Sequence, residues 1–265
     1  MKVIPAIRHV EIQKVKPKRP NVRFCTPRQL ESHKEAIWSI NASLVDWSRE
    51  EFDADFGAAK LFAAFFVDGK VVGLATVMEE EFEINGKRVF TIGLGKAVIQ
   101  HAYRNQFLVQ RALIFRWIRR FLRKPLQPIV IWGSCVSYKS YLSFVKVLRV
   151  VYPVAGVPIP EAQEQVMDKI GFHWYGDHYQ QASKVVKVPN FRVSDEAAVP
   201  RKEDLNDPAI RFYFDRVPQT AEATFGLLTI SPCIRSNFFP MGGSWARNFL
   251  RKALGINRKA AKATN

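Results

Sequence analysis

The fold is decided by the stretch from residue 60 to residue 78, which reads KLFAAFFVDGKVVGLATVM. Its first part, Lys60 to Val67, is a compact apolar run that stops at Asp68-Gly69. A second apolar run, Val71 to Met78, follows at once. Two β-capable runs around an Asp-Gly turn predict a β-hairpin.

A second turn signal lies next along the chain. Asn85-Gly86 leads into another strand-like segment, Arg88 to Gln100, so we expect three consecutive antiparallel strands. From Tyr103 to Lys124 the spacing of apolar residues predicts an amphipathic helix. Its expected buried face holds Leu108, Phe115, Ile118 and Leu122, and its expected outer face holds Arg116, Arg119, Arg120 and Arg123.

The remaining segments predict alternating helices and strands. We expect strands at residues 9–15, 129–132 and 179–188, helices at 26–44, 137–151 and 161–169, and a helix, a turn and a strand between Pro208 and Ile230. Thr26 is the expected N-cap of the first helix, and Gly171 the expected C-terminal stop of the helix that begins at Glu161. This order predicts a mixed α/β (α+β) fold, with a central mixed sheet flanked by helices.

Composition limits the class of protein. The chain has 265 residues, 48% of them apolar, which is enough for one sizeable core or two modest ones. Its three widely spaced cysteines suit a reducing compartment better than a disulfide framework. No apolar run approaches the roughly 20 residues of a membrane span. We therefore expect a cytoplasmic protein.

Charge is distributed unevenly. The net charge is +16, and the 77 residues from Ile84 to Pro160 contain 13 Lys and Arg but neither Asp nor Glu. A second acid-free stretch follows Glu222, and within it Ser244 to Ile256 predicts a basic amphipathic helix. Segments of one sign attract anionic partners. The candidates are a nucleotide-bearing cofactor, an acidic carrier protein, an anionic membrane or, less favoured, nucleic acid; a merely basic surface is the plain alternative.

The order of elements and the segment KAVIQHAYR, residues 96 to 104, resemble the GNAT superfamily of N-acyltransferases over roughly residues 60 to 150. The resemblance implies a GNAT-like acyltransferase domain at residues 1–188, with residues 189–265 as a C-terminal extension. It also implies an acyl-CoA donor, with donor contacts from Val98, Ile99, Arg104, Asn105, Gln106 and Phe107. Backbone N–H groups at the start of the following helix would meet the pyrophosphate. The sequence has no CxxC motif or Cys/His cluster, so we expect no metal.

The donor motif differs from the family pattern at its two glycine positions. Phe107 and Val109 occupy them, although glycine lets the backbone approach phosphate without a Cβ. Some relatives that lack these glycines take acyl groups from acyl carrier protein. Such an acidic carrier would dock on the basic helix face at Arg116, Arg119, Arg120 and Arg123. Both donors stay open.

Acylation of an amine needs a base for the amine proton and an acid for the leaving thiolate. The resemblance places Phe144 where the family often has the proton-donating tyrosine, and Tyr141, one turn earlier, is the candidate substitute. His101, after the expected donor strand, is the candidate base. Each has a plainer alternative, a core tyrosine and a histidine that bonds the next turn.

Three further features carry weaker signals. Of the four glutamates 79, 80, 81 and 83, alternation along a strand lets at most two face a cleft. Cys135 at a strand-to-helix turn is a candidate nucleophile, but no local signature supports it over a buried thiol. The segment His173 to Tyr179 is rich in histidine and aromatic residues and could line an acceptor pocket.

Two functions follow from these observations. The first is an acyltransferase that moves an acyl group from acyl-CoA or acyl carrier protein to an amine or hydroxyl. The second is a non-catalytic basic module that binds nucleic acid or an anionic membrane surface, with the helix at Ser244 to Ile256 lying in the interface. The two are compatible in an enzyme that is peripheral to a membrane.

Overall fold

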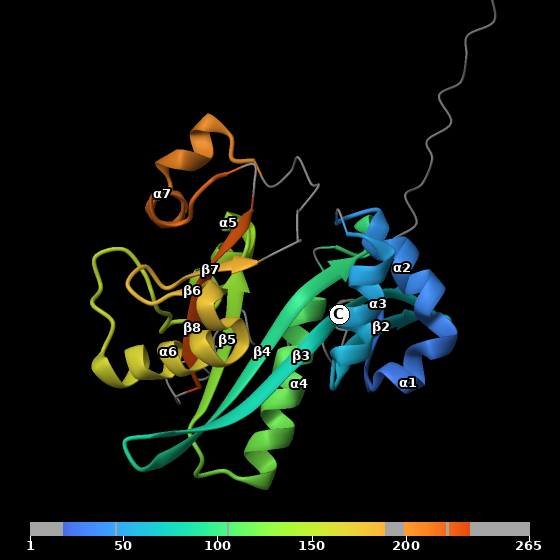
Figure 1. Ribbon diagram of the computed structural model, residues 1–265, viewed down its shortest axis with the longest axis horizontal. Helices are drawn as coiled ribbons and strands as arrows, with labels where there is room; N and C mark the ends of the chain where they lie inside the picture. Colours follow the sequence, from blue (N-terminus) through green and yellow to red (C-terminus); the bar gives the residue numbers. More distant parts are fainter. Residues whose placement is uncertain (1–17, 46, 105, 189–198, 221–222, 234–265) are drawn as a thin grey trace, which may run out of the picture.

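The structure, a computed structural model, describes residues 18–45, 47–104, 106–188, 199–220 and 223–233. Their strands form one mixed sheet of eight, in the order β1-β2-β3-β4-β5-β8-β7-β6 (Figure 1). The strands are β1 (Asn21–Cys25), β2 (Phe62–Val67), β3 (Lys70–Ile84), β4 (Lys87–Ile99), β5 (Ile129–Cys135), β6 (Tyr179–Gln180), β7 (Val185–Val188) and β8 (Thr224–Pro232). The predicted mixed α/β class is confirmed.

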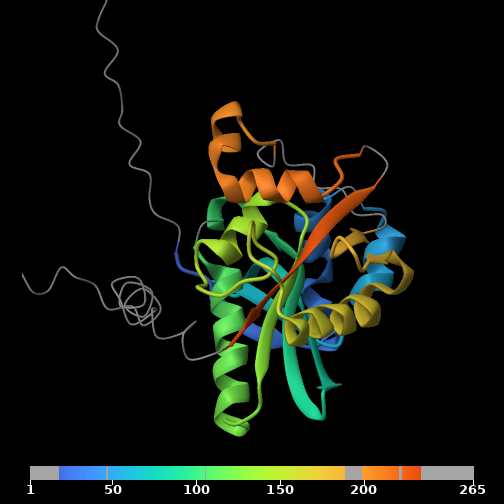
Figure 2. The ribbon, with the colours of Figure 1, turned by 90° about the vertical axis from the view of Figure 1, so that its left-hand side faces the viewer.

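Helices cover both faces of this sheet. They are α1 (Pro27–Leu30), α2 (Lys34–Ala42), α3 (Arg49–Ala58), α4 (Leu108–Arg123), α5 (Tyr138–Val145), α6 (Glu161–Tyr175) and α7 (Pro208–Arg216). Along β5, Ile131 packs with Leu113 of α4, whereas Trp132 packs with Met167 of α6. Side chains alternate along a strand, so α4 and α6 lie on opposite faces, as Figure 2 shows.

Both predicted hairpin turns are present. Asp68 and Gly69 adopt positive φ angles of 48° and 79°, and Asn85 and Gly86 adopt 49° and 71°. Two successive residues with positive φ match the twist of the flanking strands, and Asn, Asp and Gly tolerate that conformation best. β2, β3 and β4 are therefore consecutive antiparallel strands, as the sequence predicts.

The predicted orientation of α4 is right for Leu108, Arg119 and Arg123 but wrong for the other residues assigned to its two faces. Its buried residues are Leu108, Arg111, Ala112 and Leu113, and Phe115, Ile118 and Leu122 are exposed. The face toward the sheet continues through two arginines, Arg116 and Arg120, which form ion pairs with Glu79 and Glu81 of β3. Paired charges of this kind can occupy an inward face, which hydrophobic periodicity alone does not reveal.

The predicted stop at Gly171 is also wrong, because α6 continues to Tyr175 and ends at Gly176, whose φ is 52°. Gly171 is needed for packing. A Cβ at this position would lie 2.5 Å from the ring of Tyr179. The extra turn of helix brings Tyr175 up to the sheet, where its ring centroid lies 6.5 Å from that of Trp132.

The C-terminal part of the described chain belongs to the same sheet. β8 lies between β5 and β7, and Tyr213 of α7 donates a hydrogen bond to the carbonyl oxygen of Cys135. The domain boundary predicted after Val188 therefore does not divide the sheet. β1 and α3 were not predicted, and the expected strand at residues 9–15 and helix at Ser244 to Ile256 lie outside the described residues.

Candidate functional site

The site is built where two parallel strands separate. β4 and β5 pair from Phe90 with Ile129 to Gly93 with Trp132. Beyond this point β4 continues along β3 to Ile99, and β5 continues along β8, so the two strands lean apart in Figure 1. Strand edges that face away from a neighbour present N–H and C=O groups to an extended ligand.

A β-bulge accompanies the separation. Leu74 pairs with Val98 and Thr76 pairs with Gly95, so Lys96 and Ala97 together stand opposite a single residue of β3. Lys96 has a φ of 47°, and its ammonium forms an ion pair with Asp55 of α3. Bulges bend a strand and increase its twist, and they are frequent next to active sites. The bulge gives a local reason for β4 to leave β5.

Several residues predicted to hold the donor lie between the end of β4 and the start of α4. Val98 is buried and Ile99 pairs with Gly73 at the end of β4. The Arg104 Nε donates to the Ile99 carbonyl oxygen at 3.3 Å, and His101 begins the short 3-10 helix that follows β4. Gln106 is partly exposed, and Asn105 lies outside the described residues.

Phe107, at the N-cap of α4, has the backbone that the missing glycine would adopt. Its φ and ψ are 55° and 34°, in the left-handed region, and its side chain is 40% exposed. Such a conformation costs a non-glycine residue about 1–3 kcal/mol. The first N–H groups of a helix have no partner within the helix, and they favour an anion. The start of α4 thus combines a left-handed residue at the N-cap with the N–H groups of the first helical turn.

Tyr141, the predicted acid, is fully buried on α5. Its hydroxyl donates to the Pro153 carbonyl oxygen at 3.0 Å, and its ring packs against Phe212 and Tyr213 of α7. Burial raises the pKa of this hydroxyl well above its usual range. None of the contacts among the described residues joins Tyr141 to His101. These features are those of a core tyrosine.

Tyr175 is a tyrosine that reasoning from sequence did not single out. It is the last residue of α6, and its hydroxyl lies near the Ser134 side chain of β5, which acts on its pKa. Ser134 lies two residues past Trp132, where β4 and β5 have already separated. Burial raises the pKa of Tyr175 to about 12, against a smaller lowering by Ser134. The hydroxyl is therefore protonated at neutral pH and can donate a proton.

One glutamate of β3 faces the same side. Glu79 and Glu81 point to α4, and Glu80 lies 3.5 Å from the Nε2 of His173 on α6. This confirms that alternation separates the glutamates. A carboxylate beside an imidazole orients the ring, and an oriented imidazole can act as a proton acceptor.

Aromatic rings connect these two polar pairs. His173 contacts Phe82 and Trp174 with ring centroids 5.4 and 4.9 Å away, and Trp174 lies 6.1 Å from Trp132. We call Phe82, Trp132, His173, Trp174 and Tyr175 the aromatic cluster. Among the described residues, neither the Trp132 nor the Trp174 Nε1 meets a hydrogen-bond acceptor, although both atoms are buried. Buried donors of this kind usually have a partner, and two together suit a ligand oxygen.

Cys135 shows none of the features of a nucleophile. Its side chain is 1% exposed, and burial raises the pKa of the thiol to about 12. A thiol with such a pKa stays protonated near neutrality. In the described part of the chain, no three His, Cys, Asp or Glu side chains come together as a metal site.

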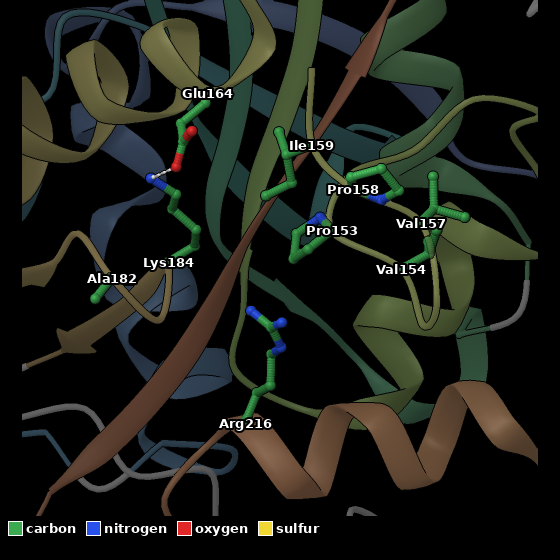
Figure 3. Close-up of a pocket in the computed structure, with 9 residues that line it drawn as sticks. All are labelled: Pro153, Val154, Val157, Pro158, Ile159, Glu164, Ala182, Lys184 and Arg216. Atoms are coloured by element: carbon green, nitrogen blue, oxygen red, sulfur yellow. Dashed lines mark ion pairs between the residues drawn. The ribbon is translucent and has the colours of Figure 1, made fainter. Parts of the chain in front are cut away.

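A cavity of about 260 Å³ is lined by residues outside the aromatic cluster (Figure 3). Lys184 and Glu164 form one wall, and the loop from Pro153 to Ile159 forms another. The Lys184 Nζ lies 2.9 Å from Glu164 and 2.7 Å from Asp168, so its charge is neutralised within the wall. The ion pair explains how a lysine can be almost fully buried here.

Comparisons by sequence give no relative: no protein-family model matches the chain, and no curated protein matches it. Comparison with solved structures gives GNAT-type acetyltransferases over about half the chain.

Three of these structures illustrate the likeness. The ribosomal-protein-alanine N-acetyltransferase of Brucella melitensis biovar Abortus 2308 is 14% identical, with 53% of this chain and 99% of that chain covered and a TM-score of 0.38. An aminoglycoside acetyltransferase from an uncultured soil metagenomic sample is 11% identical, with 54% and 99% covered and a TM-score of 0.36. The GNAT family N-acetyltransferase YhbS of Escherichia coli, solved in complex with CoA, is 15% identical, with 51% and 70% covered and a TM-score of 0.32.

Proposed function

We propose that the protein is an acyltransferase that moves an acyl group from an acyl-CoA thioester to an amine or hydroxyl. The observation that carries the proposal is the separation of β4 and β5 beyond Gly93 and Trp132, with the Tyr175 and Ser134 hydroxyls at its mouth. The amide-rich arm of the donor would lie along the free edge of β4. Its phosphates would meet the N–H groups at the start of α4, near Phe107.

The chemistry divides between the two polar pairs. The acceptor nitrogen or oxygen attacks the thioester carbon, and a new bond to that carbon forms as the C–S bond breaks. His173, held by Glu80, takes the proton that the acceptor loses. Tyr175 gives its proton to the leaving thiolate, and solvent returns a proton to Tyr175 as His173 releases one. Because its pKa is raised to about 12, the Tyr175 hydroxyl stays protonated at neutral pH and can serve as the proton donor.

We assign the acid to Tyr175 in place of Tyr141, because the Tyr141 hydroxyl is buried and already donates to a backbone carbonyl. His101, exposed at the other end of β4, remains a predicted alternative base. The Trp132 and Trp174 N–H groups are buried without an acceptor among the described residues, so they suit an acceptor substrate with an oxygen near its reacting atom.

Acyl carrier protein remains a proposed alternative donor. Of the four arginines predicted to receive it, Arg116 and Arg120 are paired with glutamates of β3, and Arg119 and Arg123 are exposed. A carrier that docks on these two would present its thioester at the far end of α4 from Phe107. Since α4 has 16 residues and rises about 1.5 Å per residue, that distance is about 24 Å. CoA therefore fits the site better.

Calorimetry with CoA and acetyl-CoA tests the donor. The wild type should bind both, and Arg104→Ala should weaken binding about tenfold, since a charge-assisted contact to phosphate is lost. Arg28→Ala, an exposed arginine on α1, is the matched control and should bind like the wild type. A chain that binds neither compound, or that binds acyl carrier protein alone, would refute the assignment of an acyl-CoA donor.

A further inference from the structure

The C-terminal half of α4 exposes an unusual amount of apolar surface. The α4 tip, as we call it, consists of Phe115, Ile118, Phe121, Leu122 and Leu126, with exposed fractions of 41, 39, 42, 74 and 95%. These are half of the ten large apolar residues that the described chain exposes. Contiguous exposed apolar surface usually marks an interaction site.

The shape of the α4 tip is convex. Exposure rises toward the end of the helix, from about 40% at Phe115 to nearly complete exposure at Leu126 in the following loop. In Figures 1 and 2 this end of α4 projects at the lower margin of the molecule, away from the other helices. A projecting apolar end is shaped to insert into a partner. It does not form a groove that could receive a peptide or a helix.

Positive charge surrounds the apolar residues. Arg119 and Arg123 are exposed, and the side chain of Lys124 is 52% exposed. Of the nearby acids, Glu79 and Glu81 are paired with Arg116 and Arg120 on the inner face of the helix, and Glu81 also lies 3.8 Å from Lys124. Between Ile84 and Pro160 the sequence contains no other acid that could offset this charge. The outward field of the α4 tip is therefore cationic.

We propose that the α4 tip docks on an anionic membrane surface. Leucine and phenylalanine side chains enter the boundary between headgroups and acyl chains, and neighbouring arginines and lysines contact lipid phosphates. Here Leu122 and Leu126 insert, while Arg119, Arg123 and Lys124 lie at the level of the phosphates. The contact is peripheral: none of the helices among the described residues is long and apolar enough to span a bilayer. This inference does not depend on the proposed acyl transfer.

Co-sedimentation of the full-length protein with vesicles tests the inference. The wild type should bind vesicles of phosphatidylcholine with phosphatidylglycerol, bind pure phosphatidylcholine poorly, and dissociate at high salt. Leu122→Glu and Leu126→Glu should each lower the partition coefficient about tenfold or more, because a buried leucine is worth at least that factor. Arg123→Gln should lower it about fivefold, the effect of one cation near an anionic surface.

Matched controls separate the α4 tip from general charge. Val199→Glu makes the same change at a residue that is 69% exposed elsewhere, and Arg149→Gln removes another exposed arginine. Both should bind vesicles nearly as the wild type does. Leu126 lies in a loop and is 95% exposed, so Leu126→Glu should fold normally, as thermal denaturation would verify.

Three results would overturn the inference. In the first, Leu122→Glu and Leu126→Glu bind vesicles no worse than Val199→Glu. Cys233 packs in the same hydrophobic cluster as Trp117 of α4. This result would therefore be expected if the chain that follows Cys233 covers the α4 tip or binds lipid in its place. In the second, vesicle binding does not depend on anionic lipid. In the third, no vesicle binds, but an acidic carrier protein does and is sensitive to Leu122→Glu.

Discussion

Tyr175 lies beside Ser134, two residues beyond the last β5 residue that pairs with β4, and the Ser134 side chain lowers the pKa of the tyrosine against the larger effect of burial. This interaction joins the end of α6 to the point where the strands separate. It places a protonated tyrosine, with a pKa raised to about 12 by burial, beside the expected path of a thioester.

Replacing Tyr175 should affect chemistry and spare the fold. Tyr175→Phe removes the proposed proton donor and keeps the ring beside Trp132, so release of CoA from acetyl-CoA with an amine panel should fall about a hundredfold or more. Thiol release measured with a chromogenic disulfide reports this rate. In the wild type, the rate should show no alkaline loss from the acid up to pH 10, since Tyr175 loses its proton only near pH 12. A Tyr175→Phe enzyme of normal rate would contradict the assignment.

Tyr141→Phe gives the opposite pattern. It removes the hydrogen bond to the Pro153 carbonyl oxygen and leaves that buried acceptor without its partner. We expect a loss of about 1–3 kcal/mol in the free energy of unfolding, with the rate per folded molecule unchanged. Urea unfolding and the CoA-release assay measure the two effects separately. Loss of rate without loss of stability would restore Tyr141 as the acid.

The ion pair between Arg116 and Glu79 should contribute to stability, because both side chains are less than one fifth exposed. Glu79→Gln should destabilise the protein by about 1–3 kcal/mol, since the arginine is left on the inner face of α4 without its counter-charge. Glu31→Gln, at an exposed glutamate, should stay within about 0.5 kcal/mol of the wild type. Equal effects of the two substitutions in urea would show that the pair is no more than a surface contact.

Two glycine substitutions are expected to change the free energy of unfolding in opposite directions. Gly171→Ala places a Cβ 2.5 Å from the Tyr179 ring and should destabilise by about 1–3 kcal/mol. Gly57→Ala, in the last turn of α3, meets nothing within 4 Å and should stabilise by about 0.5–1 kcal/mol. Thermal and urea unfolding give both values. A neutral Gly171→Ala would mean that Tyr179 moves aside at little cost.

Phe107→Gly should relieve backbone strain and open the phosphate site. The left-handed conformation at this N-cap favours glycine, so stability should stay equal or rise by up to about 1 kcal/mol. Affinity for CoA should increase, because the Cβ no longer stands near the helix start. Val109→Gly, inside α4, should instead cost about 1 kcal/mol. Calorimetry measures the affinity for CoA, and urea unfolding measures the stability of both variants. A Phe107→Gly protein that binds CoA more weakly, or that is less stable than the wild type, would contradict the prediction.

The sequence predicted best where the signal was local. Asp68-Gly69 and Asn85-Gly86 specify their own turns through positive φ, so β2, β3 and β4 could be placed from neighbouring residues alone. The residues proposed to hold the donor, from Val98 to Phe107, are also close in sequence, but their role stays a prediction.

Contacts between distant residues decided what the sequence did not predict. The face of α4 depends on Glu79 and Glu81, some 40 residues earlier, which draw Arg116 and Arg120 inward. Tyr175 lies at the candidate site because α6 continues beyond Gly171. Gly171 is inside the helix because the Tyr179 ring leaves no space for a Cβ at that position, a contact that the local sequence does not reveal. The insertion of β8 beside β5 is a property of the sheet, with no local signal in the sequence.

The most direct test of the account is hydrogen–deuterium exchange with and without acetyl-CoA. If the donor lies in the separation between β4 and β5, exchange should slow in the peptides that cover Leu94–Ile99 and the first turn of α4, Leu108–Arg111. Peptides of β2, outside the site, should not change. Protection at both segments is the predicted result. Saturating acetyl-CoA that leaves both unchanged, or that protects only a different surface, would contradict the central claim.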